Sequence, residues 1–271
     1  MLFKLASSLK LSTFFKPTYL FGTTTVHYPV LFKNFSNKCD STSSFMVKQL
    51  EESEIDEAAA CLAEAFSARE MITANFHIAK DSLYEGIKKD LQKAVNGNLG
   101  LVCRDRKTNK LAGVIYYEDL NETIDPKIWQ DNMDQDENWG KLDEFYKYLF
   151  SMLHPYATPK ERNDVLLFKK LGVSSEFTKM GVATNMMFAA RYLHPRTTKA
   201  KRRLMIASNE KTYNFCKKHG WELIKQIDVK DYNLMPKKEG SFSKDGNVYL
   251  LKYEPKEGKT LIQEIKSFFD K

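Results

Sequence analysis

The segment spanning residues 171–193 constrains the fold of this chain more than any other part of it. Its letters, LGVSSEFTKMGVATNMMFAARYL, predict the end of a strand, a turn that carries the isolated Gly181, and an amphipathic helix. The first N–H groups of a helix have no partner inside the helix, so a helix that starts at such a turn can hold a phosphate. A second segment, residues 208–221, predicts a short helix that Gly220 ends ahead of a new strand.

Hydrophobic spacing predicts alternating strands and helices from Met46 onward. The turn DRKTNK joins two apolar runs and predicts a hairpin. The expected strands cover residues 47–52, 98–104, 111–117, 165–173, 203–208, 221–229 and 247–253. The expected helices cover residues 54–66, 81–95, 139–153, 180–193, 210–219 and 259–270. No internal repeat and no second domain are indicated.

The two opening segments resemble the acyl-CoA-binding core of the GCN5-related N-acetyltransferase (GNAT) superfamily, and the order of elements is similar to that of the family. The family pattern Q/R-x-x-G-x-G/A aligns with TKMGVA, which puts Thr178 at the Gln/Arg position, Gly181 at the glycine and Ala183 at the small residue. The resemblance implies the fold class α/β (α+β). We therefore expect a GNAT fold in one domain, with a mixed central sheet of about six to seven strands flanked by helices.

The resemblance also implies where acetyl-CoA would bind as co-substrate. In the family, backbone amides of this turn hold the pyrophosphate of coenzyme A, and a splayed gap after the preceding strand lets the pantetheine arm pair with exposed backbone. The implied cofactor-binding residues are Leu171, Val173, Thr178, Lys179, Met180, Gly181, Val182, Ala183 and Asn209. Two plainer interpretations stay open: tight packing of helix on strand at Gly181, and core roles for the Leu171 and Val173 side chains.

A candidate general base lies in the sequence FSAREMI at residues 66–72. This stretch resembles the F-F-x-x-E-P-L segment after the first helix of arylalkylamine-type N-acetyltransferases, where the glutamate acts as base through water. Glu70 is the matching position, and Met71 replaces the proline. The alternative is that Glu70 is a surface residue or a helix cap.

A candidate general acid follows from the family pattern N-x-x-A-x-x-L/F-Y-x-x-x-G-F, which aligns with residues 209–221. Cys216 stands where the family places its tyrosine, and Tyr213 lies about one helical turn earlier. The thiol or the phenol would protonate the leaving thiolate. The alternative is an inert Cys216, with the acid role lost or filled by water.

The resemblance implies an N-acetyltransferase that moves an acetyl group from acetyl-CoA to a primary amine of a small molecule, by direct attack in a ternary complex. The alternative is a catalytically inactive GNAT-fold protein that acts as an acyl-CoA-binding or structural subunit. Protein partners are not indicated by the sequence.

The insertion at residues 118–164 bears on the acceptor. Residues 118–144 hold ten acidic residues against Lys127 and Lys141. Lying over a cleft, such a segment would concentrate cationic amines. Otherwise it is a solvated loop.

The net charge of +7 does not indicate a nucleic-acid partner, because residues 1–45 carry +4 of it. This extension is basic, rich in Ser and Thr, and amphipathic at its start, which is typical of a mitochondrial transit peptide. The alternative is a disordered tail on a cytoplasmic protein. We expect the acyltransferase domain to cover residues 46–257 and a charged C-terminal helix to lie within residues 258–271.

The spacing of the cysteines argues against a metal-binding protein, and the length of the apolar runs argues against a membrane-spanning one. Four cysteines lie far apart, without a CxxC pair or a histidine cluster, so we expect reduced thiols and no metal: Cys39, Cys61, Cys103 and Cys216. No apolar run reaches the roughly 20 residues that span a bilayer, so no membrane span is expected.

Overall fold

A computed structural model describes residues 44–120, 137–156, 164–197, 200, 202–229 and 246–254. These residues belong to one compact unit, Ser44–Lys271. The predicted transit peptide, the predicted C-terminal helix and much of the acidic insertion lie outside the described residues. Among the described residues, no helix is both long enough and apolar enough to cross a membrane.

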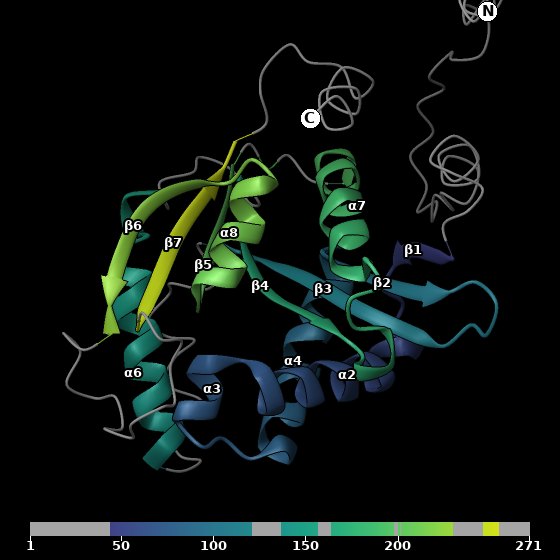
Figure 1. Cartoon of the computed structure of the whole chain (residues 1–271), viewed down its shortest axis with the longest axis horizontal. Coiled ribbons are helices and arrows are strands. Elements are labelled where there is room, and N and C mark those ends of the chain that lie inside the picture. The colour runs from purple at the N-terminus through teal and green to yellow at the C-terminus, as the bar shows by residue number, and fades with distance from the viewer. Residues whose placement is uncertain are drawn as a thin grey trace, which may run out of the picture. The chain divides into compact units, whose positions relative to one another are not determined.

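A seven-stranded mixed sheet forms the centre of the molecule, as expected (Figure 1). Its strands stand in the order β1-β2-β3-β4-β5-β7-β6, and every neighbouring pair is antiparallel except β4 and β5. The strands are β1 (Phe45–Gln49), β2 (Gly100–Asp105), β3 (Leu111–Asp119), β4 (Val165–Val173), β5 (Arg202–Ala207), β6 (Glu222–Asp228) and β7 (Asn247–Tyr253).

Helices cover both faces of this sheet (Figure 1). They are α2 (Ile55–Arg69), α3 (Met71–Asn75), α4 (Lys80–Asn96), α6 (Glu137–Ser151), α7 (Val182–Thr197) and α8 (Glu210–Lys218). Two glycines show which helix covers which face of the sheet. A β-carbon on Gly172 would lie 2.8 Å from Leu62 Cδ2 of α2. A β-carbon on Gly113 would lie 2.9 Å from Val182 Cγ1 of α7. Gly172 pairs with the residue after Gly113, so their faces are opposite.

Most predicted elements are confirmed, and two differences matter for the site. The strands at 165–173 and 247–253 have the predicted bounds, and the turn at 105–110 joins an antiparallel pair. The helix predicted from residue 180 begins instead at Val182, because Lys179 (φ 64°) and Gly181 (φ 81°) are left-handed. The short helix α3 was not predicted; its five residues are too few for a periodic pattern to appear.

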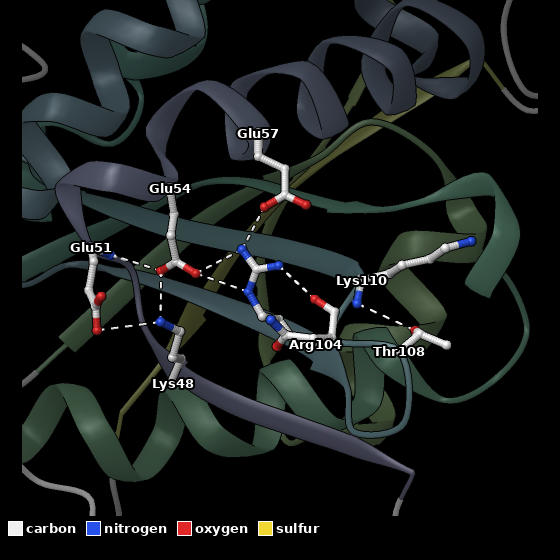
Figure 2. Close-up of polar contacts among 8 residues, drawn as sticks. Lys48, Glu51, Glu54, Glu57, Arg104, Thr108 and Lys110 are labelled. Atoms are coloured by element: carbon white, nitrogen blue, oxygen red, sulfur yellow. Dashed lines mark hydrogen bonds and ion pairs between the residues drawn. The ribbon is translucent and has the colours of Figure 1, made fainter.

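A buried arginine ties β2 to the start of α2 (Figure 2). Arg104 Nε donates to Glu54 Oε1 at 3.0 Å, Nη1 donates to the Asn109 carbonyl at 2.9 Å, and Nη2 forms ion pairs with Glu54 and Glu57. The side chains of Arg104 and Glu54 are 11% and 9% exposed. Lys48 Nζ lies 3.1 Å from the other oxygen of Glu54, so this buried carboxylate has two cationic partners.

We expect Arg104→Ala to lower the free energy of unfolding by about 3 kcal/mol, because it leaves Glu54 as a buried carboxylate with only Lys48 opposite. Lys110→Ala is the control. It removes an ion pair with Glu176 that is more than half exposed on both sides, which is worth about 1 kcal/mol or less. Urea unfolding of both variants measures the difference, and equal losses would contradict a buried, structural role for Arg104.

Candidate active site

The parallel strands β4 and β5 separate partway along their length. They pair from Val165–Arg202 as far as Phe168–Met205, and no pairing follows. Beyond that point β4 continues to Val173 against β3 alone, while β5 continues against β7. The sheet therefore opens between β4 and β5, which is the splayed gap expected from the sequence.

The backbone of β4 presents alternate residues to this gap. The Ser174 N–H, just after β4, donates to the Ala112 carbonyl of β3 at 3.0 Å. In an antiparallel pair the residues that bond across the ladder recur every second position, so Gly172 faces β3 in the same way. The backbone groups of Leu171 and Val173 therefore point away from β3 and towards the gap.

The turn after β4 contains Gly181, whose left-handed backbone conformation favours a glycine. Gly181 has a φ of 81°, and a β-carbon added to it would meet no atom within 4 Å, so its outer side is open. Thr178 Oγ1 donates to the Ser175 carbonyl at 3.1 Å, and α7 starts at Val182. The open side of Gly181 and the first amides of α7 form a cradle that fits a phosphate. Met180, also in this turn, is 54% exposed.

A cavity of about 1140 Å³ occupies the gap and extends beneath α6. Leu171, Val173 and Ala183 line it on the β4 and α7 side. On the β5 and α8 side the lining includes Met205, Ile206, Ser208, Asn209, Thr212 and Cys216. The structure thus brings together the β4 edge, the end of the glycine turn and the start of α8.

Glu70 also lines this cavity, and it caps a helix. It is the N-cap residue of α3, where Oε1 accepts from the Ile72 N–H at 3.2 Å and Oε2 accepts from the Thr73 N–H at 2.6 Å. Capping therefore holds the carboxylate in one orientation at the cavity wall. Glu70 is therefore a helix cap, which is one of the alternatives left open by the sequence, and the same carboxylate lies at the cavity wall where a base would be needed.

The two candidate acids on α8 have different surroundings. Cys216 is buried and lines the cavity; its Sγ lies 3.3 Å from Met205 Sδ, and burial raises its pKa to about 12. Tyr213 stacks on Tyr249 of β7, with ring centroids 4.5 Å apart and planes 6° apart, and lies outside the cavity lining. Asn209 caps α8 through a 2.9 Å bond from the Thr212 N–H. Cys216 alone of the two acids reaches the cavity, and its high pKa makes it a weak acid.

Charged residues that the sequence did not assign to the site meet on the α4 side of the cavity. Tyr116 Oη donates to Asp90 Oδ2 at 2.9 Å, and Lys169 Nζ lies 3.0 Å from Glu118 Oε2. Burial raises the pKa of Asp90, and Glu118 adds to the shift. Lys170 Nζ lies 4.9 Å from the centre of the Phe66 ring. Burial, followed by repulsion from Lys169, lowers the pKa of Lys170.

One further acid comes from α6, within the predicted acidic insertion. Asp143 is 5% exposed, lines the cavity, and its Oδ2 has no hydrogen-bond partner among the residues that the structure describes. Burial raises the pKa of Asp143, with Lys147 and Lys169 acting in the opposite direction. Part of the insertion therefore does lie over the cleft. Its remaining acids at 122–136 fall outside the described residues.

Comparison with known proteins assigns the fold. No protein-family model matches the sequence, and a search of curated proteins gives no match. The C-terminal condensation domain of Ebony, in complex with beta-alanyl-dopamine, matches with a TM-score of 0.66 at 11% identity, over 78% of this chain and 99% of that one.

Two further structures match over 78% of this chain and 100% of their own, each with a TM-score of 0.62. They are the mosquito arylalkylamine N-acetyltransferase like 5b, at 15% identity, and the Drosophila melanogaster polyamine N-acetyltransferase, at 12% identity. At these identities the likeness concerns the fold: the chain has the GNAT fold that its sequence predicts.

We expect the buried thiols to be unreactive towards iodoacetamide at pH 8. Burial raises the pKa of Cys103 and of Cys216 to about 12, so about one thiol in ten thousand is the reactive thiolate at that pH. The half-buried Cys61 should be alkylated first. Peptide mapping by mass spectrometry follows the three rates, and a Cys216 as reactive as Cys61 would restore it as an acid.

Proposed function

We propose that the chain is an N-acetyltransferase that transfers the acetyl group of acetyl-CoA to a primary amine of a small molecule. The observation that carries the proposal is the gap between β4 and β5, because its cavity has titratable walls and reaches Ala183 of α7, two residues after Gly181. The N-acetyltransferases that share the fold give it further support.

The gap and turn fit acetyl-CoA along their length. The open side of Gly181 and the first amides of α7 would hold the pyrophosphate, with Lys179 as a nearby cation. The backbone of Leu171 and Val173 would pair with the amide groups of the pantetheine arm, as an added strand pairs with a sheet edge. The thioester would then lie where β4 and β5 close together, at Phe168 and Met205.

Direct attack in a ternary complex needs the acceptor amine to lose a proton. Glu70 would take that proton through a water molecule, since its carboxylate lines the cavity. The amine nitrogen then bonds to the thioester carbon, the C–S bond breaks, and coenzyme A leaves as a thiolate. Cys216 has a pKa of about 12 and Tyr213 lies outside the cavity lining, so we propose that neither protonates this thiolate, which takes its proton from the solvent as coenzyme A leaves, while Glu70 returns the amine's proton to the solvent.

The buried Cys216 also favours a second candidate function. A weakly acidic thiol at the position of the family's tyrosine fits an inactive GNAT-fold protein that serves as an acyl-CoA-binding or structural subunit. Glu70 and the acceptor side of the cavity favour the enzyme. Release of coenzyme A thiol with a panel of amines separates the two: binding of acetyl-CoA without thiol release from any amine would support the subunit and exclude the enzyme.

We expect acetyl-CoA to raise the melting temperature of the protein, and Gly181→Val to abolish most of that rise. A side chain at Gly181 would fill the open side of the cradle and would have to adopt a left-handed backbone, which costs about 1–2 kcal/mol. Gly140→Ala on α6, where a β-carbon also meets no atom within 4 Å, is the matched control. Thermal shift measures both variants, and a wild-type protein that acetyl-CoA does not stabilise would rule out the enzyme and the acyl-CoA-binding subunit.

We expect Glu70→Gln to lower kcat by about a hundredfold or more while acetyl-CoA binding is kept. The glutamine oxygen can still accept from an amide at the start of α3, so the helix cap survives in part. Glu210→Gln, at the exposed start of α8, is the control. Steady-state kinetics over a pH series measure the effect, and an unchanged pH profile in Glu70→Gln would remove Glu70 as the base.

A further inference from the structure

Building on the proposed acetyltransferase function, we propose that α6 carries a second cation site in the acceptor cavity, centred on Asp143. The preferred acceptor would then be a molecule with a primary amine at one end and a second cationic group at the other. The amine near Glu70 receives the acetyl group, and the Asp143 carboxylate holds the far cation.

The first argument is the state of the Asp143 carboxylate. Asp143 is 5% exposed, and its Oδ2 is buried and has no hydrogen-bond partner among the described residues. Leaving a buried polar group unpaired costs about 1–3 kcal/mol, and more for a charged one, so folded proteins rarely keep such groups. Asp143 lines the cavity, so a cation bound there could satisfy it.

The protein's own cations do not neutralise Asp143. Lys169 Nζ lies 3.0 Å from Glu118 Oε2, so it is already paired. Lys147 and Lys169 both act to lower the pKa of Asp143, yet burial outweighs them and the pKa is raised. Among the described residues no donor bonds to Asp143 Oδ2, so a cationic group of a ligand could supply that partner.

The neighbours of Asp143 on α6 suit a cation. Trp139 lies four residues before it and Tyr146 three residues after it, so the three side chains share one face of the helix, and all three line the cavity. An aromatic ring attracts a cation through its negative face. A carboxylate between two aromatic side chains is therefore a site for an ammonium or guanidinium group.

The site is placed for a ligand that also reaches Glu70. Glu70, Asp143 and Tyr146 line the same cavity, and both carboxylates, after burial, raise the pKa of the Tyr146 hydroxyl. One acceptor could therefore pass along Tyr146, with one end at each carboxylate. Lys170, which also lines the cavity, has a lowered pKa, which favours its neutral form and weakens its repulsion of a cation.

The test compares an α,ω-alkyldiamine with the monoamine of equal chain length. Wild-type protein should show a higher kcat/KM for the diamine, and Asp143→Asn should reduce the diamine-to-monoamine ratio by about ten- to a hundredfold, as the loss of a charged hydrogen bond predicts. Glu144→Gln is the matched control, because this acid is the next residue on α6 and is exposed. An equal loss for both amines would mean that Asp143 binds the reacting amine, and would overturn the proposal.

Two readouts do not depend on turnover. With coenzyme A bound, the diamine should stabilise wild-type protein more than the monoamine does; the absence of a difference would overturn the proposal even if no variant folds.

Asp143→Asn should unfold at a higher temperature than wild type, because it removes an unpaired buried charge. A lower unfolding temperature would indicate a structural Asp143. If no amine is acetylated, the proposed function fails, while these readouts still decide the cation site.

Discussion

The separation of β4 from β5 beyond Phe168 and Met205 is the constraint on which the rest of the site depends. Because β5 pairs with β7 instead, the backbone of β4 from Leu171 onward faces a gap rather than a strand. The glycine turn lies at one end of this gap, and the helices over β4 enclose the other. A continuous parallel pair would remove both the cavity and the exposed strand edge.

The sequence predicted the parts of the site whose signal is local. The apolar run VLLFKKLGV gave the bounds of β4, and the isolated Gly181 gave the turn, since a positive φ is a property of one residue. Glu70 was found by motif, but its role as the cap of α3 was not, because a five-residue helix has no periodic signature. Tyr213 was placed near Cys216 by helical spacing. The three-residue offset turns it towards Tyr249 instead, since three residues fall short of a full turn.

The charged acceptor side could not be predicted in this way, because its residues meet only in the folded chain. Asp90, Glu118, Lys170 and Asp143 come from α4, β3, β4 and α6. Weak signals were present: Asp90 follows Leu83 and Ile87 on an otherwise apolar face, and two lysines interrupt the apolar run of β4. Such signals indicate that a charge is buried. Which charges share a cavity follows from the sheet order.

Two kinds of buried charge can be told apart by their partners. Every guanidinium nitrogen of Arg104 has an acceptor, so its burial stabilises the junction of β2 and α2 without leaving anything for a ligand to bind. Asp143 is buried to a similar degree, yet its Oδ2 has no hydrogen-bond partner in the described part of the chain, and it lines a cavity. Burial alone does not distinguish a structural charge from a functional one. The difference lies in whether the fold itself supplies the partner, and on this ground we propose a functional role for Asp143 and a structural one for Arg104.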